Sequence, residues 1–377
     1  MNASKPKAQF GVPSSRRNSI RTLSLVAAAL LASALATPLM AQDDDRNQPF
    51  LPTPVRSVST MPANGDVNPY GVAFVPPGFP AGTVVPGDIL VSNFNNSQNL
   101  QGTGTTIVRI PAAGAPSVFF QGAPPLGLST ALNILRKGFV LVGNFPSSDG
   151  TCGNSTAGSI LVINSTGQQI ASITDPSIDG PWDSALFDGG NSAKLFVSNG
   201  LSGKVFRLDL RVTPAGVTLE KATQIASGYQ FQCDPVTFVD APTGLVYDPA
   251  RDVLYVASTV DNAVFAVEDA GSTTHDRGTG RMIYQDSVHL HGALAMAMAP
   301  NGHLLVSDND AINSDPNQPS EIVEFTIGGK FVKQLPVDPS QGGSFGLATE
   351  VLRNDVAVFA AVDDVTNTLL IWNVPLP

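Results

Sequence analysis

One unit of short β-rich runs and tight turns recurs six times in this chain of 377 residues, and this repetition limits the possible folds more than any other feature. The clearest copy is residues 240–270, DAPTGLVYDPARDVLYVASTVDNAVFAVEDA. Turns at Asp248-Pro249 and Asp261-Asn262 separate its three β-rich runs. Turn residues every eight to twelve positions, with no helical period between them, predict a meander of antiparallel strands.

Each copy begins with a small lead-in that ends in glycine and an apolar residue. The third copy departs from this pattern, because Asp183 stands where the others have glycine. The six lead-ins are Pro69-Tyr70-Gly71-Val72, Pro125-Leu126-Gly127-Leu128, Pro181-Trp182-Asp183-Ser184, Pro242-Thr243-Gly244-Leu245, Leu290-His291-Gly292-Ala293 and Ser344-Phe345-Gly346-Leu347. Two further β-rich runs follow each lead-in, and a weaker fourth run follows in the first five copies.

Six units of about 45–50 residues predict an all-β fold, a six-bladed β-propeller of four-stranded antiparallel blades. The sixth unit lacks a fourth strand, but an unassigned β-rich segment, about 55–61, precedes the first unit. We expect this N-terminal strand to join the last blade and close the ring. A two-sheet sandwich would not give six similar units, and a β-helix has shorter coils. The expected blades are about 69–122, 124–174, 178–228, 240–286, 289–338, and 342–377 plus 54–61.

The first 41 residues have the pattern of a signal peptide. A basic segment with Arg16, Arg17 and Arg21 precedes an Ala- and Leu-rich apolar run, and Ala41 precedes a polar stretch. We therefore expect export to the periplasm or the extracellular space, by the Sec or the twin-arginine route. The mature chain would then have a disordered start, 42–53, a single propeller domain, 54–377, and no membrane span.

The composition excludes some classes of partner. The formal net charge is −10, and removing the basic signal segment makes the mature chain more acidic still. Nucleic acids and anionic membranes require a basic face, so we expect neither as a partner. A protein, a glycan or a small molecule remains as the expected partner of a monomeric chain.

The two cysteines, Cys152 and Cys233, both fall in expected loops. An exported protein can oxidise such a pair, so they are candidates for a disulfide. The alternative is two free thiols in loops.

The segment GLVYDPARDVLYVASTVDNAVFAV, within residues 240–270, resembles the blade of NHL-repeat and YVTN-type propellers. Over residues 69–377 the chain is similar to the six-bladed superfamily that also contains the gluconolactonases. Gluconolactonase-like members hold a divalent metal at the channel mouth through carboxylate and amide ligands. The equivalent positions here are Tyr70, Leu126, Trp182, Thr243, His291 and Phe345, most of which cannot ligate a hard cation. The resemblance thus implies the propeller scaffold. The departure at the ligand positions argues against the family's lactonase chemistry.

Candidate ligand-binding residues occur at the channel opening and at the ends of the second strands. We expect them to converge on one face, where aromatic rings beside amides and carboxylates would form a pocket. They are Tyr70, Asn93, Asn144, Trp182, Asn199, His291, Asp308 and Asp363. The alternative is that the amides and carboxylates only cap strand ends, while the aromatic side chains fill the channel.

No catalytic residue is assigned, since the sequence has no Gly-rich phosphate loop and no H-E-x-x-H. His289, His291 and Asp308 are candidate metal ligands, and the acidic loop 307–318 is a candidate for calcium. The alternative for this loop is a solvated acidic segment without a metal. No cofactor is therefore assigned, and a divalent cation, calcium or a transition metal, is the candidate. These features favour a non-catalytic, exported binding module; a metal-dependent lactonase-like hydrolase or a lyase at the channel mouth is the alternative.

Overall fold

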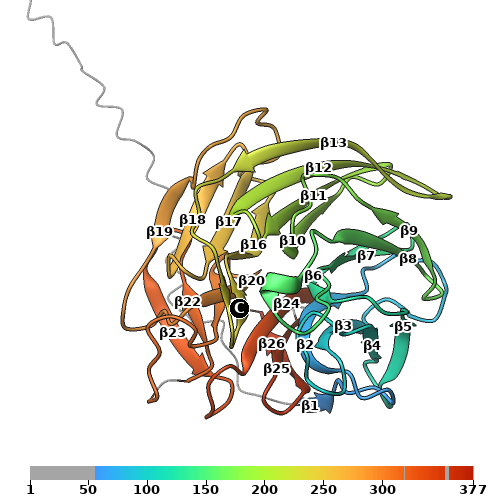
Figure 1. Ribbon diagram of the computed structural model, residues 1–377, viewed down its shortest axis with the longest axis horizontal. Coiled ribbons are helices and arrows are strands. Elements are labelled where there is room, and N and C mark those ends of the chain that lie inside the picture. Colours follow the sequence, from blue (N-terminus) through green and yellow to red (C-terminus); the bar gives the residue numbers. More distant parts are fainter. Residues whose placement is uncertain (1–55, 318, 353–355, 377) are drawn as a thin grey trace, which may run out of the picture. The chain divides into compact units, whose positions relative to one another are not determined.

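In a computed structural model the chain forms a six-bladed β-propeller (Figure 1). The structure describes residues 56–317, 319–352 and 356–376. Six four-stranded antiparallel sheets surround a central channel, and the N-terminal strand lies at the outer edge of the last sheet. The predicted fold, including the closure of the ring, is therefore confirmed. The expected signal peptide and the expected disordered start of the mature chain lie outside the described residues.

The blades follow one another in chain order, each from its inner to its outer strand. Blade 1 is β2 (Val67–Phe74), β3 (Ile89–Asn95), β4 (Thr106–Ile110) and β5 (Ser117–Gln121); blade 2 is β6 (Leu128–Leu135), β7 (Phe139–Asn144), β8 (Ser159–Asn164) and β9 (Gln169–Ile173). Blade 3 is β10 (Pro181–Asp188), β11 (Ser192–Asn199), β12 (Lys204–Thr213) and β13 (Gly216–Ala226); blade 4 is β16 (Pro242–Asp248), β17 (Val253–Ser258), β18 (Ala263–Glu268) and β19 (Arg281–Tyr284).

Blade 5 is β20 (Ala293–Met298), β21 (Leu304–Asp308), β22 (Glu321–Phe325) and β23 (Phe331–Pro336); blade 6 is β24 (Ser344–Leu352), β25 (Val356–Asp363), β26 (Thr368–Pro375) and β1 (Arg56–Ser59). A short hairpin, β14 (Gln232–Asp234) and β15 (Phe238–Asp240), joins blade 3 to blade 4. The helix in the described part of the chain is the three-residue 3₁₀ turn η1 (Cys152–Asn154), so no described helix is long and apolar enough to cross a membrane.

The ring closes through backbone pairing between the two ends of the described chain. β1 runs antiparallel to β26, with Val58 opposite Leu369. Beyond the strand, the Thr60 amide donates to the Asn367 carbonyl at 3.0 Å. Blade 6 thereby has a fourth strand from the opposite end of the sequence.

Each repeated lead-in coincides with a shift in the pairing register between the inner strand and the second strand of its blade. The shifts lie at 69–72, 128–132, 181–184, 242–245, 293–296 and 344–347. Here the backbone of one blade approaches the next blade closely. A Cβ on Gly346 would lie only 1.8 Å from the Tyr70 carbonyl oxygen, and one on Gly244 only 2.3 Å from that of Leu294. The glycine of the motif is therefore required by space at the junction between blades.

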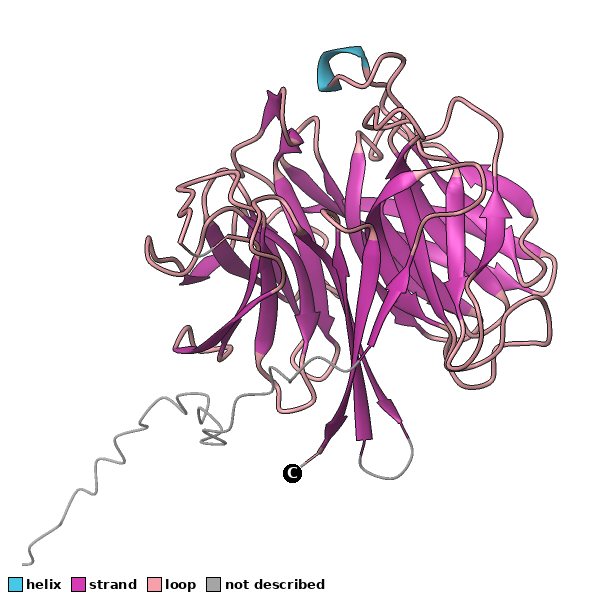
Figure 2. Ribbon diagram, turned by 90° about the horizontal axis from the view of Figure 1, so that it is seen from below, coloured by secondary structure: helices cyan, strands magenta, loops and turns pink. Residues whose placement is uncertain are grey.

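Neighbouring blades pack face to face, so their middle strands are covered on both sides. Every residue of Val253–Ser258 in β17 is buried for this reason. Seen from the side, η1 is drawn in cyan at one end of the channel, and the C-terminal end of the chain lies at the other (Figure 2). The loops between second and third strands share the η1 end with the lead-ins of the inner strands.

Candidate functional site

Six aromatic side chains fill the η1 end of the channel, and we call them the aromatic plug. Tyr70 stacks on Phe345 with ring centroids 4.4 Å apart, and it meets Trp182 edge-on at 5.5 Å. All six rings are buried, with exposed fractions of 6% or less. The plug comprises Tyr70, Phe94, Phe145, Trp182, Phe238 and Phe345. The aromatic residues of three lead-ins thus converge as expected, but they pack against one another.

A cavity of about 430 Å³, the plug-face pocket, lies directly above this plug. Tyr70 and Phe345 belong to its floor, and loops from several blades form its walls. The walls carry the amides of Asn68, Asn95, Asn99 and Gln101 and the carboxylates of Asp234, Asp310 and Asp364. None of its lining residues is Lys, Arg or His. The pocket therefore offers hydrogen-bonding oxygens and amides with an excess of negative charge.

A chain of hydrogen bonds holds the amides of this pocket in place. The Asn95 side chain donates to Asn99 Oδ1 at 2.7 Å. With its amide oriented by its neighbours, Asn68 accepts from Asn95 Nδ2 at 3.0 Å and donates to Asp364 Oδ1 at 2.8 Å. The Asn68 backbone amide also donates to Asn367 Oδ1 at 2.8 Å. The polar wall is thus preorganised, which reduces the entropic cost of binding a ligand.

Asp364 is the carboxylate at the end of this chain. Burial, reinforced by the neighbouring Asp363, raises its pKa to about 7. The group is therefore divided between the carboxylic acid and the carboxylate near neutral pH, and it can donate a hydrogen bond as well as accept one.

The second-strand residues predicted for this site do not line the pocket. Asn93 and Asn199 are fully buried, and their amides donate to the carbonyls of Thr60 at 3.1 Å and Ser177 at 3.0 Å. Asn144 accepts from the Gly127 amide at 3.0 Å, and Asp363 accepts from the Thr366 hydroxyl at 2.5 Å. These side chains bind backbone and turn groups close to their own strands, as the alternative interpretation proposed. Of the eight predicted ligand-binding residues, the pocket contains Tyr70.

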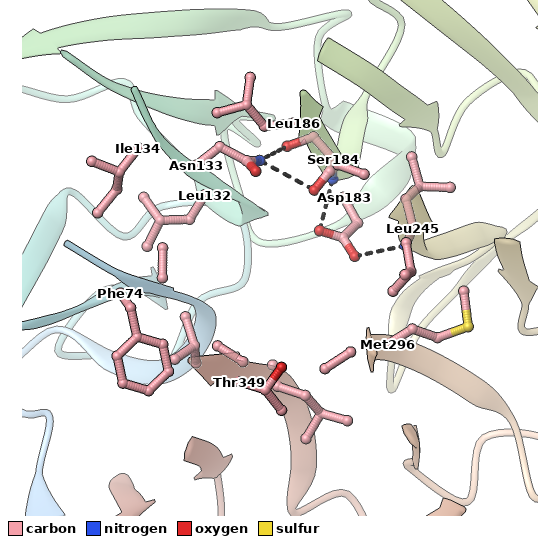
Figure 3. A pocket seen from close by; sticks show the side chains of 18 of the residues that line it. Phe74, Leu132, Asn133, Ile134, Asp183, Ser184, Leu186, Leu245, Met296 and Thr349 are labelled. Carbon is pink, nitrogen blue, oxygen red and sulfur yellow. Dashed lines mark hydrogen bonds between the residues drawn. The ribbon is translucent and has the colours of Figure 1, made fainter. Parts of the chain in front are cut away.

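Below the plug, the channel is an open cavity of about 530 Å³ (Figure 3). All six inner strands contribute to its wall. Asp183, the residue that replaces glycine in the third lead-in, lies in this wall and is 7% exposed. The aromatic plug separates this cavity from the plug-face pocket, since Tyr70, Trp182 and Phe345 immediately precede channel-lining segments of the inner strands.

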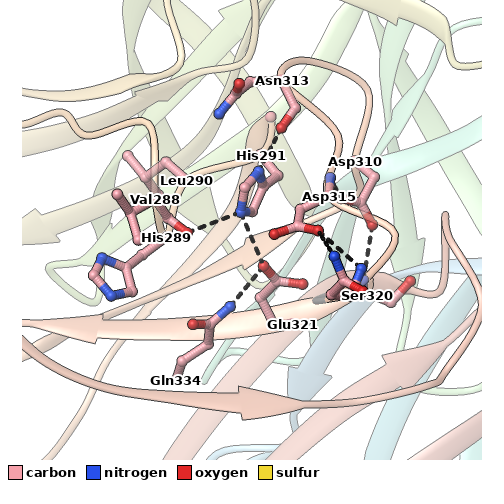
Figure 4. Close-up of polar contacts among 12 residues, drawn as sticks. Val288, His289, Leu290, His291, Asp310, Asn313, Asp315, Ser320, Glu321 and Gln334 are labelled. Atoms are coloured by element: carbon pink, nitrogen blue, oxygen red, sulfur yellow. Dashed lines mark hydrogen bonds and ion pairs between the residues drawn. The ribbon is translucent and has the colours of Figure 1, made fainter.

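The predicted metal ligands His289, His291 and Asp308 do not form a metal site among the described residues. Figure 4 shows the His291 ring between Asn313 and Glu321, with His289 apart from it. His289 stacks on Phe331 and contacts Asp286 Oδ2 at 2.8 Å. His291 is buried, with Nδ1 2.5 Å from the Asn313 carbonyl oxygen and Nε2 3.1 Å from that of Val288. Both ring nitrogens of His291 thus face oxygen acceptors, whereas a metal ligand must present a free lone pair. The His291 side chain therefore points into the interior of blade 5 and not toward the channel opening.

Near His291 the acidic loop encloses buried carboxyl groups. Glu321 Oε1 lies 3.6 Å from His291 Nε2, and burial raises the Glu321 pKa to about 8. Burial and then Glu321 raise the pKa of Asp308 as well. Asp310 is engaged within the loop, because its carboxylate accepts from the Ser320 amide at 3.0 Å. Within residues 56–317, 319–352 and 356–376, no three His, Cys, Asp or Glu side chains are grouped to hold a metal.

Cys152 and Cys233 form a disulfide. Cys152 begins η1, in the loop between β7 and β8, and Cys233 is the middle residue of β14. The bond ties the β14–β15 hairpin to blade 2. Because Phe238 of this hairpin belongs to the plug, the disulfide holds the hairpin in place at the plug face.

Comparisons with known proteins support the fold and leave the function open. No protein-family model matches the chain, and no curated protein matches it in sequence. Among solved structures, a protein of unknown function from Dyadobacter fermentans has a TM-score of 0.53 at 10% identity, covering 86% of this chain and 99% of that chain. The comparisons therefore identify the chain as a six-bladed propeller by its fold and assign it to no sequence family.

Two further similar structures have a TM-score of 0.50. One is the calcium-binding protein regucalcin from Agrobacterium tumefaciens, at 12% identity and covering 85% of this chain and 95% of that chain. The other is a chain of a mitotic checkpoint complex, at 11% identity and covering 86% and 95%. The expected resemblance to the gluconolactonase-like superfamily is confirmed as a similarity of fold. A fold that these different proteins share does not identify a function.

Several residues of the plug-face pocket lie only one or two positions from residues that the sequence analysis predicted. Asn95, Asn309 and Asp364 line it, whereas the predicted residues were Asn93, Asp308 and Asp363. For Asp308 and Asn309, and for Asp363 and Asp364, the offset is one position, and successive side chains of an extended chain point to opposite faces. The polar run Asn95-Asn96 after β3 and the pair Asp363-Asp364 were the signals that could have found them.

Proposed function

We propose that this propeller is an exported, non-catalytic binding protein that holds a neutral, polyhydroxylated ligand of carbohydrate type in the plug-face pocket. The observation that carries the proposal is the fixed chain of amides that runs from Asn99 to Asp364 over an aromatic floor. Amides and half-protonated carboxyls both donate and accept hydrogen bonds, as a ligand with many hydroxyl groups requires. A pocket of this kind, concave with a few fixed polar groups, is typical of small-ligand sites.

The charge of the pocket limits the class of ligand. Asp234, Asp310 and Asp364 line it, and none of its lining residues is basic. A phosphate or carboxylate ligand would meet like charge without a compensating cation. Tyr70 and Phe345 are stacked on each other beneath the pocket, so they give its floor an apolar character.

The proposal of a binding role rests on the chemistry of the pocket side chains. Its lining offers no histidine, lysine or cysteine as a base or nucleophile. Export is proposed from the signal-peptide pattern of residues 1–41 and agrees with a disulfide, which persists in oxidising compartments.

The test is calorimetric titration of the protein with a panel of neutral mono- and oligosaccharides. Asp364→Ala and Asn95→Ala should each weaken binding about tenfold or more, because each removes a buried hydrogen-bonding group. The matched control is Gln98→Ala, since Gln98 is exposed in the same loop and does not line the pocket. Equal affinity in Asp364→Ala, or no binding of any saccharide, would contradict the proposal. Turnover of lactones that depended on an added divalent metal would support the lactonase alternative instead.

A further inference from the structure

The channel below the plug is a second cavity, distinct from the plug-face pocket in position and in chemistry. Its wall contains one apolar side chain from each blade: Val72, Leu132, Ala185, Leu245, Met296 and Leu347. The plug closes its inner end, so the cavity opens only toward the face opposite η1. An open cavity of about 530 Å³, lined by these apolar side chains and by polar groups, has the size of a small-molecule site.

Asp183 places a carboxyl group in this wall, close to the apolar side chain of Leu245 (Figure 3). Its Oδ1 accepts from the Ser184 amide at 2.7 Å, and its Oδ2 accepts from the Leu245 amide at 3.2 Å. A carboxylate has about four acceptor positions, so each oxygen retains capacity for a ligand. Neither bond involves a cationic side chain, and the negative charge of Asp183 is therefore not compensated.

The arginine and the tyrosine that line the cavity are engaged with other groups. Arg136 is paired with Asp188, and its backbone amide donates to Asp188 Oδ2 at 2.9 Å. Tyr247 donates to Asp252 Oδ1 at 2.9 Å. Glu350 adds a further carboxyl. The cavity thus has an excess of acidic groups, and its basic residue already has a partner.

Asp183 is not needed to join the blades. The other five lead-ins have glycine at this position, and their junctions close without a carboxylate bridge. At Gly71 a Cβ would meet Ser92 Oγ at 2.6 Å, whereas the backbone of blade 3 admits a side chain at the same place. In blade 3, Ser198 takes the place that Ser92 has in blade 1, and its Oγ accepts a hydrogen bond from the Asp183 backbone amide at 3.0 Å. The backbone contact at this junction is therefore the same in blades 1 and 3, and blade 3 differs by the added carboxyl group.

We propose that the channel binds a primary ammonium group attached to an apolar chain. The ammonium group would contact the Asp183 carboxylate, and the chain would lie against the six apolar side chains of the wall. A buried carboxylate is stabilised by a cation with which it exchanges a charge-assisted hydrogen bond. A metal ion is a poorer occupant, because it requires several oxygen ligands and Asp183 supplies one carboxylate. A hydroxyl compound of the same length would keep the apolar contacts but lose the ionic one.

The test compares n-hexylammonium with hexan-1-ol by calorimetric titration at pH 8.5. The wild-type protein should bind n-hexylammonium more tightly than the alcohol. Asp183→Asn and Asp183→Gly should each weaken n-hexylammonium binding at least about tenfold, because the bond to a charged group is lost. Binding of hexan-1-ol should change by no more than about threefold, since the apolar contacts remain.

Two further variants keep the outcome interpretable. Asp183→Gly restores the residue that the other five lead-ins use, so it tests the site even if Asp183→Asn folds poorly. Ala348→Phe narrows the channel and should weaken the binding of both hexyl compounds. Gln98→Ala, at an exposed position outside both cavities, should leave n-hexylammonium binding unchanged. Equal binding to wild type and Asp183→Gly, or no binding to wild type, would overturn the proposal.

Discussion

Asp183 couples the stability of the fold to pH. Burial raises its pKa from 3.8 to about 7, because the apolar wall disfavours the charged form. The folded state therefore holds this proton more tightly than the unfolded state. The stabilisation is fully present below pH 3.8 and is lost as the pH rises through 7.

Asp183→Asn should remove this dependence, since an amide does not titrate. Relative to wild type, we expect the variant to gain about 2–4 kcal/mol of unfolding free energy between pH 4 and pH 8. The measurement is urea unfolding of both proteins at several pH values. Asp308, Glu321 and Asp364 also have raised pKa values, but both proteins contain them and their effects cancel in the difference. Parallel stability curves for the two proteins would show that Asp183 does not titrate as described.

Single residues of the site were harder to predict than the fold. The exception to the glycine pattern was visible at Asp183, but the sequence did not reveal that its side chain enters the channel. His291 occupies the same position in its lead-in as Tyr70, yet it turns into blade 5 to contact the Asn313 and Val288 carbonyls. Such choices depend on partners distant in sequence, which a repeat pattern does not contain.

Among the structural elements, β1 allows the most specific prediction about stability. In an antiparallel pair the backbone amides alternate between the partner strand and the outside. The bond from Thr60 to Asn367 places the Val58 amide toward β26 and the Ser57 amide away from it. Val58→Pro should therefore lower the unfolding free energy by about 2–3 kcal/mol, whereas Ser57→Pro should have a much smaller effect.

Thermal unfolding of the two proline variants measures this difference. Val58→Ala is the control for the side chain, because Val58 also packs against the core. The effect of Val58→Pro should exceed that of Val58→Ala. Equal stability of Ser57→Pro and Val58→Pro would mean that β1 does not close the ring through its backbone.

Repeated elements were predictable and unrepeated ones were not. The lead-ins mark one register shift per inner strand, and this local regularity allowed the blades to be counted from the sequence. The hairpin β14–β15 occurs once and was not predicted, although it supplies Phe238 to the plug and Asp234 to the plug-face pocket.

For the whole ring, the disulfide is the long-range covalent constraint. Cys152 and Cys233 are 81 residues apart, and the bond spans all of blade 3. Replacing both with serine should lower the unfolding free energy by about 2–4 kcal/mol, because the unfolded chain regains conformational entropy. Calorimetry with and without a reductant tests this: the reductant should destabilise wild type and have no effect on the double variant. A reductant effect of equal size in both proteins would rule out the bond as its cause.

The closure of the ring also sets an order of events during synthesis. A ribosome makes β1 before any other described strand and β26 after all of them, so β1 must wait for its partner while five blades are completed. Until then the edge of β1 that pairs with β26 is exposed, and unpaired strand edges promote association between chains. Translation or transport that pauses before residue 368 would hold the chain in this open state. A new molecule becomes a closed ring only when its last strand arrives.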